Sequence, residues 1–280
     1  MSSQRPVIVG VDGSPASLGA VRWAADEAVR LHRPLQITHA LGVSGQNEPA
    51  PDEHQLAVQA AVEARTSQPG LHVTTGTWQG GAAQVLVEQS RHASLVVVGS
   101  HGPSGFVALP VDSLGVQVAA HAHCPVLVVH DAQRWADPAA ALPRHGPVLV
   151  GTDGSDNAQL AIELAFAEAA SRRADLIALR AWQEPPHRWG FAASRDRLAD
   201  NARQALAADL EPWRAKYPGV RVELRAVHGA PAPVLLAESR DALMVVLSPR
   251  GTGGFDELRL GSVTQQVLDH ASAPVLVARH

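Results

Sequence analysis

Lysine and cysteine are nearly absent from this sequence. Lys216 is the only lysine and Cys124 the only cysteine among its 280 residues. A phosphate loop of the Walker type and covalent catalysis through a lysine both need a lysine in the site, and Lys216 lies in the turn-like stretch KYPG, so both are disfavoured. A single cysteine cannot form an internal disulfide, which indicates a reducing compartment. We expect no metal site, because a zinc site needs three or four converging ligands and the sequence offers no second cysteine beside Cys124.

Strong net charge and long apolar runs are also missing. The formal net charge is −4, so the chain lacks the excess of positive charge that is typical of proteins that bind nucleic acid or anionic membranes. The longest apolar stretches fall well short of the ~20 residues that cross a bilayer. The first residues, MSSQRPVIVGVDGS, show no charged segment followed by an apolar one, as a secretory signal would. These absences predict a soluble, cytoplasmic protein that binds neither nucleic acid nor membranes.

The sequence contains one long internal repeat. VIVGVDGSPASLGAVRWAADEAVRL at residues 7–31 resembles VLVGTDGSDNAQLAIELAFAEAASR at residues 148–172. CPVLVVH at residues 124–130 resembles APVLVAR at residues 273–279 in the same way. Both the beginning and the end of one unit are therefore repeated, which predicts two copies of one plan within the chain.

The length of the chain and the stretch between the copies suggest where the domains divide. Domains typically contain about 150 residues, so a chain of 280 residues is expected to form two domains. The intervening stretch DAQRWADPAAALPRHG shows no clear hydrophobic periodicity and contains several residues that break strands and helices. Both features are typical of a linker. We predict one domain over residues 1–132, a linker over 133–146 and a second domain over 147–280.

Apolar runs alternate with helical patterns within each copy. In the first copy we expect strands at residues 7–9, 35–40, 72–77, 95–98 and 125–129, with helices after residue 14, at about 53–66, at 82–90 and at about 113–121. This alternation of strands and helices predicts an α/β fold with a doubly wound parallel sheet in each copy. In such sheets ligands bind beyond the carboxyl ends of the strands.

A glycine-rich turn follows the fourth expected strand of each copy. It reads Gly99-Ser-His-Gly102 in the first copy and LSPRGTGGFDELRLGS at residues 247–262 in the second. Each copy resembles the universal stress protein family, whose ATP-binding members carry Gly, two residues, Gly, nine residues and Gly-Ser/Thr at this place. The resemblance covers nearly all of both copies. It implies two tandem five-stranded sheets with strand order 3-2-1-4-5, of the adenine nucleotide alpha hydrolase-like type, arranged as an intramolecular pseudo-dimer.

The glycine pattern is incomplete in both copies. In the first, Asp112-Ser113 stands where the pattern has Gly-Ser. In the second, Ser248 replaces the first glycine, whereas Gly251 and Gly261-Ser262 are kept. A carboxylate about 5 Å from a phosphate would repel it by about 3 kcal/mol at an effective dielectric constant near 20. We therefore rank the second copy as the better nucleotide site; a Mg²⁺ ion that bridges Asp112 to the phosphate would reverse the ranking.

The resemblance implies a role for each position of the pattern. The aspartate after the first strand lies against the adenosine part of ATP, the alanine that ends the second strand offers its main chain to adenine, and the glycine after the third strand lines the crevice. The later glycines and serines meet the phosphates. The expected ATP-binding residues are Asp153, Ala181, Gly229, Ser248, Gly251, Gly261 and Ser262 in the second copy, and Asp12, Ala40, Gly80, Gly99, Gly102 and Ser113 in the first.

Structural roles compete with these functional ones. Asp12 and Asp153 are each followed by Gly-Ser, and such an aspartate commonly organises a turn before a helix. Ser262-Val-Thr-Gln265 matches a capping box, in which the serine satisfies its own helix. The glycines of the turns also serve close packing.

No catalytic constellation is visible. The sequence has no Gly-x-Ser-x-Gly elbow and no HExxH motif, and Asp12-Gly13-Ser14-Pro15 is not glycine-rich enough for the phosphate loop of the related ATP-pyrophosphatases. We expect a stress-response regulator that binds ATP, with at most slow hydrolysis, and an unknown protein partner or a second copy of the chain in a homodimer. The alternative is a dimeric interaction module with vestigial crevices and no nucleotide.

Overall fold

The structure is a computed structural model, and two compact units form its chain. It describes residues 4–42, 51–100, 113–130, 135, 137, 141–143, 145–184, 195–252 and 259–279, with only the backbone for 51–54. Unit 1 comprises Met1–Leu142 with Arg279–His280, and unit 2 comprises Pro143–Ala278. No helix among the described residues is long and apolar enough to cross a membrane.

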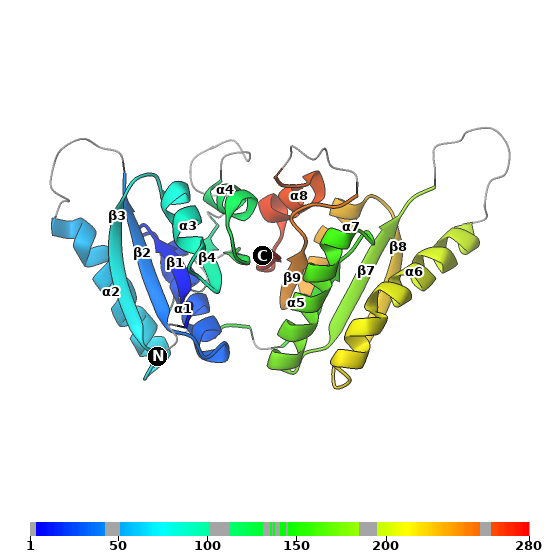
Figure 1. Ribbon diagram of the computed structural model, residues 1–280, viewed down its shortest axis with the longest axis horizontal. Coiled ribbons are helices and arrows are strands. Elements are labelled where there is room, and N and C mark those ends of the chain that lie inside the picture. The colour runs from blue at the N-terminus through cyan, green and yellow to red at the C-terminus, as the bar shows by residue number, and fades with distance from the viewer. Residues whose placement is uncertain are drawn as a thin grey trace. The chain divides into compact units, whose positions relative to one another are not determined.

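Unit 1 is a parallel sheet covered by helices (Figure 1). Its elements are β1 (Val7–Val11), α1 (Pro15–Arg30), β2 (Leu35–Leu41), α2 (Pro51–Ser67), β3 (Val73–Gln79), α3 (Ala82–Ser90), β4 (Leu95–Gly99), α4 (Leu114–His121) and β5 (Val126–Val129). The strands lie in the order β3-β2-β1-β4-β5, and each of these pairs is parallel. This is the order that the family resemblance implies.

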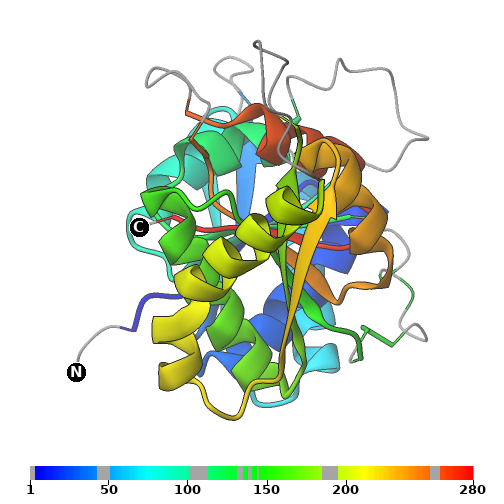
Figure 2. The same ribbon diagram turned by 90° about the vertical axis from the view of Figure 1, so that its right-hand side faces the viewer.

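Unit 2 repeats the same plan, and Figure 2 shows it from the side of α6 and β8. Its elements are β6 (Val148–Gly151), α5 (Asp156–Arg172), β7 (Leu176–Trp182), α6 (Arg195–Lys216), β8 (Val222–His228), α7 (Pro231–Glu238), the 3-10 turn η3 (Ser239–Asp241), β9 (Met244–Leu247), α8 (Ser262–His270) and β10 (Val275–Val277). The parallel strands follow the order β8-β7-β6-β9-β10. The predicted α/β class and the doubly wound parallel sheet are confirmed.

The burial pattern explains why each unit forms three layers. The central strands β1, β4, β6 and β9 are runs of valine and leucine with both faces covered, as is expected when helices pack on both sides of a sheet. In unit 1, α1 packs against α2 and α3 packs against α4; in unit 2, α5 packs against α6 and α7 against α8. Each pair of helices covers one face of its sheet.

A glycine turn links the first strand of each unit to its first helix. Gly13 has φ of +81° and Gly154 has φ of +82°, a region that favours glycine because it lacks a Cβ atom. After Gly13, Ser14 caps α1 by accepting a hydrogen bond from the Ser17 N–H at 3.2 Å, and Pro15 occupies the first helical position. The chain thereby leaves the carboxyl end of β1 and enters a helix within a few residues.

Candidate functional site

The loops that follow the strands of unit 2 meet at one edge of its sheet, because all its strands are parallel. Asp153 follows β6, Ala181 is the penultimate residue of β7, and Gly229 follows β8 with φ of +146°. Ser248 follows β9 directly. The helix α8 begins at this edge, at the top of the view in Figure 1. The predicted residues of the second copy therefore lie at the ends of neighbouring strands.

A hydrogen bond joins the loop after β6 to the loop after β9. Oδ2 of Asp153 accepts a hydrogen bond from the Thr252 N–H at 2.5 Å, and its Oδ1 accepts one from the Ser155 N–H at 3.0 Å. A Cβ atom added at Gly251 would overlap with the Asp153 carboxylate. Gly251 is thus needed for the close approach of a carboxylate to the main chain.

Asp153 is ionised at neutral pH. Its partial burial acts to raise the pKa, but hydrogen bonds from Thr252 and Ser155 outweigh that effect and hold the pKa below the usual value of an aspartate. The site therefore carries a fixed negative charge beside Gly251. Such a carboxylate can accept hydrogen bonds from hydroxyl groups of a ligand.

The first turn of α8 lacks a side-chain cap. Gly261 is its N-cap residue, with φ of −77° and ψ of 151°, and no side chain accepts a hydrogen bond there. A Cβ atom at Gly261 would lie 3.4 Å from Cα of Arg250 and 3.7 Å from N of Gly251, so the start of the helix lies against the glycine turn. The capping-box interpretation of Ser262 is wrong, because this exposed serine is the first helical residue and not the cap.

The serine that departs from the family pattern stabilises the turn. Ser248 is buried, its hydroxyl donates to the Arg250 carbonyl at 2.8 Å, and its own carbonyl accepts from the Thr264 hydroxyl at 2.8 Å. Among the described residues, only His32 and Arg173 are non-glycine residues with positive φ. Position 248 therefore takes a serine without backbone strain.

The corresponding residues of unit 1 also lie at the ends of strands and at the start of a helix. Oδ1 of Asp12 accepts from the Ser14 N–H at 2.9 Å, and Ser113 caps α4 by accepting from the Val116 N–H at 3.3 Å. Ala40 lies opposite Trp78 near the end of β2, Gly80 has φ of +127° after β3, and Gly99 ends β4. Gly102 and Asp112 lie outside the described residues.

The turn-organising role expected of both aspartates is present in both units. Asp12 and Asp153 each accept a hydrogen bond from the N–H two residues later, which is the geometry of an Asx turn. Asp153 also holds Thr252, 99 residues away in sequence. The structural role is thus common to the two copies, and the link to the glycine turn is described for unit 2.

An arginine that the motif analysis did not single out lies against the first loop of unit 2. The guanidinium of Arg180 covers Gly154, where an added Cβ atom would overlap with Nη2, and the same nitrogen donates to Oδ2 of Asp209 at 2.9 Å. The side chain of Arg180 is 13% exposed. The sequence could have indicated Arg180 as a site residue. It is an arginine within an otherwise apolar strand, and it lies next to the alanine that is expected to meet adenine.

Polar and aromatic groups continue this edge along β7 and β8. The rings of Trp182 and His228 meet edge to face with centroids 4.8 Å apart, and Nε2 of His228 lies 2.7 Å from Oε2 of Glu184. Hydrogen bonds from His228 and then Arg195 lower the pKa of Glu184 to about 2. This carboxylate is therefore charged at any physiological pH.

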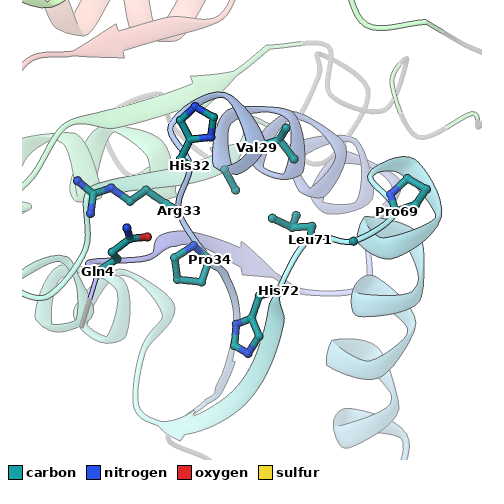
Figure 3. Close-up of a pocket in the computed structure, with 10 residues that line it drawn as sticks. Gln4, Val29, His32, Arg33, Pro34, Pro69, Leu71 and His72 are labelled. Carbon is teal, nitrogen blue, oxygen red and sulfur yellow. The ribbon is translucent and has the colours of Figure 1, made fainter. Parts of the chain in front are cut away.

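A broad depression in unit 1 lies away from the predicted site. It has a volume of about 620 Å³, and Figure 3 shows Gln4 and Arg33 on one side of it and Pro69 on the other. Its residues, which include Pro34 and His72, precede strands or end helices, so it lies at the amino-terminal edge of the sheet. None of the predicted ATP-binding residues lines it.

Comparison with known proteins decides the family. The model of the universal stress protein family matches twice, at residues 4–130 and 145–279. The chain belongs to the universal stress protein family. It is 34% identical over 301 residues to a universal stress protein of Mycobacterium tuberculosis strain H37Rv, with 99% of this chain and 97% of the relative covered. A universal stress protein of Mycolicibacterium smegmatis is 32% identical over 288 residues, with 98% and 96% covered.

Solved structures show the same fold for this universal stress protein. A universal stress protein from Archaeoglobus fulgidus matches with a TM-score of 0.70 at 17% identity, covering 99% of this chain and 97% of that one. A putative universal stress protein from Pseudomonas aeruginosa matches with a TM-score of 0.66 at 18% identity, covering 99% and 94%. The tandem organisation predicted from the repeat is confirmed by the two matches to the family model.

Proposed function

We propose that this universal stress protein binds ATP at the carboxyl edge of unit 2 and acts as a nucleotide-dependent stress-response regulator. The observation that carries the proposal is the start of α8, where Gly261 provides no capping side chain and lies against the turn at Gly251. The first N–H groups of a helix have no partner within it, and the helix dipole adds positive potential at that end. An uncapped helix start is therefore a favourable place for a phosphate.

The residues around this helix start suit the rest of a nucleotide. The N–H groups of the first turn of α8 would hold phosphate oxygens, and the ionised carboxylate of Asp153 would accept hydrogen bonds from ribose hydroxyls. The Thr252 N–H is already bonded to Asp153. For this N–H to bind a phosphate, Asp153 must release it, so ligand binding would rearrange the loop after β9.

That rearrangement is how occupancy would regulate a partner. A ligand shifts a conformational equilibrium only if it contacts the two states differently, and exchange of the Thr252 N–H between Asp153 and a phosphate supplies such a difference. The exposed residues Gly251 and Thr252 would then present a different surface to a protein partner or to a second copy of the chain. We assign no residue to acid-base catalysis, so the proposed activity is binding. A Mg²⁺ ion bound with the phosphates would neutralise part of their charge.

A second candidate is an interaction module that binds no nucleotide. The observation that favours it is the same contact between Asp153 and Thr252, which places a carboxylate against Gly251 and occupies an N–H that a phosphate would use. Under this alternative the unit keeps the fold, and the crevice is closed by its own side chain. The two functions differ in whether any adenine nucleotide binds.

Calorimetric titration of the full chain with MgATP tests the proposal. We expect binding, and a loss of affinity of about a hundredfold in Gly261→Asp, which places at the start of α8 the carboxylate that the first copy has at Asp112. Aspartate is a good N-cap residue, so this variant should fold at least as well as the parent chain.

The matched control is Gly219→Asp. Gly219 lies in an exposed turn of the same unit with open space where a side chain would be, so the control adds the same charge away from the site. We expect its affinity for MgATP to equal that of the parent chain. No heat of binding at millimolar MgATP, together with an unchanged melting temperature, would reject the proposal and favour the interaction module.

A further inference from the structure

Three enclosed hydrogen-bond donors of unit 2 have no partner. They are Oγ of Ser155, Nε of Arg180 and Nε1 of Trp182, and each atom is buried without a hydrogen bond. Ser155 precedes α5, and the other two residues lie near the carboxyl end of β7. All three therefore belong to the edge of the sheet that carries Asp153.

These donors lie close together. The guanidinium of Arg180 covers Gly154, the residue next to Ser155 in sequence. Trp182 lies two residues beyond Arg180 on β7, so both side chains project from the same face of the strand, about 7 Å apart along it. Ala181 lies between them, and its main chain is the one expected to meet adenine. The three donors thus border the predicted adenosine position.

Unpaired donors of this kind are rare in folded proteins, because enclosing an N–H or O–H without an acceptor costs free energy. The charge of Arg180 does not explain the cluster, since Nη2 is already paired with Asp209 at 2.9 Å. What remains unpaired is the Nε–H, together with one hydroxyl and one indole N–H. Three such donors in one place indicate that an acceptor absent from the free protein belongs there.

Unit 1 has no such cluster at the equivalent positions. Leu35 and Leu176 each pair with the first residue of the central strand, so the registers of β2 and β7 make His39 equivalent to Arg180 and Leu41 equivalent to Trp182. The ring of His39 is bonded through Nδ1 to the Val11 carbonyl at 2.8 Å, and Leu41 has no polar group. Unit 1 has an unpaired donor elsewhere, at Nε1 of Trp23, but at these strand positions the unpaired donors belong to the copy that we propose to bind ATP.

Ser14, the equivalent of Ser155, is satisfied as well. Its hydroxyl accepts from the Ser17 N–H at 3.2 Å as the cap of α1. The hydroxyl of Ser155 stands at the same place before α5 but makes no capping hydrogen bond. The Ser155 side chain also helps to lower the pKa of Asp153, so this hydroxyl lies beside the carboxylate that we propose to meet the ribose.

We infer that Ser155, Arg180 and Trp182 are specificity-determining residues, which donate hydrogen bonds to ring nitrogens and ribose oxygens of the adenosine part of ATP. The inference rests on the proposed function of unit 2. Because each donor is enclosed in the free protein, these side chains turn towards the ligand when it binds. None of them bonds to the phosphates, so they select the nucleoside and leave the affinity for a bare polyphosphate unchanged.

Three variants remove one unpaired donor each, and Ser155→Ala changes the size of its side chain least. Ser155→Ala removes the hydroxyl, Trp182→Phe removes the indole N–H, and Arg180→Lys keeps a cation beside Asp209 but has no Nε–H. Because removal of an unpaired donor relieves a cost, we expect the melting temperature of free Ser155→Ala to stay or to rise by about 2 °C. The same variants should weaken ATP about five- to tenfold.

Two probes separate the nucleoside from the phosphates. Adenosine should lose affinity in the three variants by the same factor as ATP, and inorganic tripolyphosphate should bind all of them as it binds the parent chain. The change in tryptophan emission on adding ATP should disappear in Trp182→Phe. The matched control in unit 1 is Ser14→Ala, which should lower the melting temperature, because it removes a helix cap, and leave ATP binding unchanged.

The outcomes separate this inference from the proposed function. If the parent chain binds ATP and the three variants bind it equally well, the inference is overturned and the proposed function stands. A fall in the melting temperature of free Ser155→Ala also overturns the inference, since it means that a partner such as buried water already satisfies this donor. If the parent chain binds no ATP, the proposed function is overturned.

Discussion

Unit 1 caps the starts of α1 and α4 with serine side chains, whereas unit 2 leaves the equivalent starts of α5 and α8 without a side-chain cap. Ser14 caps α1 and Ser113 caps α4. In unit 2, Ser155 makes no capping hydrogen bond before α5, and Gly261 has no side chain with which to cap α8. The sheet order is the same in both units, so the fold tolerates either arrangement. The two copies therefore differ in which polar groups they leave unsatisfied, although they share one fold.

The first loop of each unit is also covered differently. In unit 1 a Cβ atom added at Gly13 would lie 2.7 Å from Cδ2 of Leu56, so an apolar side chain covers the turn. In unit 2 the guanidinium of Arg180, paired with Asp209, covers Gly154. An apolar cover needs no hydrogen bonds, whereas a guanidinium has five donors to satisfy. The polar cover therefore makes the second copy depend on an ion pair.

The largest effect is expected from breaking this ion pair. Asp209→Ala leaves a largely buried guanidinium with one acceptor fewer, and we expect the free energy of unfolding to fall by about 2 kcal/mol. Denaturant titration measures it. Asp200→Ala is the control, because Asp200 pairs with Arg203 on the exposed face of the same helix at 4.0 Å, and this pair should contribute less than about 0.5 kcal/mol. Equal losses in the two variants would show that Arg180 needs no acceptor.

A smaller effect distinguishes the two helix starts. Ser113→Ala removes the cap of α4 and should lower the free energy of unfolding by about 1 kcal/mol. Ser262→Ala, at the aligned position of unit 2, changes an exposed first-turn residue and should have an effect within about 0.5 kcal/mol. Thermal unfolding of the two variants side by side tests the difference. A loss in Ser262→Ala as large as that in Ser113→Ala would remove the contrast between the two units.

The smallest effect concerns Asp153 and pH. The folded protein holds the pKa of Asp153 below its usual value, so this carboxylate stabilises the fold above the pKa of the unfolded chain, and that stabilisation is lost as the pH falls through the folded pKa. Asp153→Asn should therefore be less stable than the parent chain at pH 7 by less than about 1 kcal/mol, because the carboxylate is only partly buried and solvent screens its charge.

The pH profile of that difference is the measurement. The gap in the free energy of unfolding between Asp153→Asn and the parent chain should close as the pH falls through the lowered pKa of folded Asp153, because the aspartate is then protonated in both states. An asparagine oxygen can still accept from the Ser155 N–H, so the variant keeps the turn and tests the charge. A gap that stays constant with pH would mean that the carboxylate gains nothing from Thr252.

The fold could be predicted from the sequence because its signals are local. The alternation of apolar runs with helical patterns, repeated twice, was enough for the parallel sheets, and the helix at Ala82–Ser90 has the bounds expected for it. The first strand is longer than the apolar run Val7–Val9 and ends at Val11, because Gly10 and Val11 continue the pairing with β2. Pairing with a neighbouring strand sets such limits.

The candidate site was less predictable because its contacts join distant parts of the chain. The pattern Ser262-Val-Thr-Gln265 suggested a capping serine, but the cap depends on how the chain enters the helix, and here Gly261 takes that place. The bond between Asp153 and Thr252 spans 99 residues, and no local pattern indicates it. Arg180 likewise has a meaning only once Gly154 and Asp209 are beside it.

Because one polypeptide carries both copies, every molecule contains one of each in a fixed ratio. A symmetric homodimer of single-copy subunits has identical sites and inherits every substitution twice. A fused pair can retain ligand contacts in one half while the other drifts towards a purely structural role. The expected stoichiometry at saturation is then one nucleotide per polypeptide, which is one nucleotide for each pair of copies. A symmetric dimer of identical single-copy subunits has two equivalent sites, so it binds one nucleotide per pair only if its symmetry is broken.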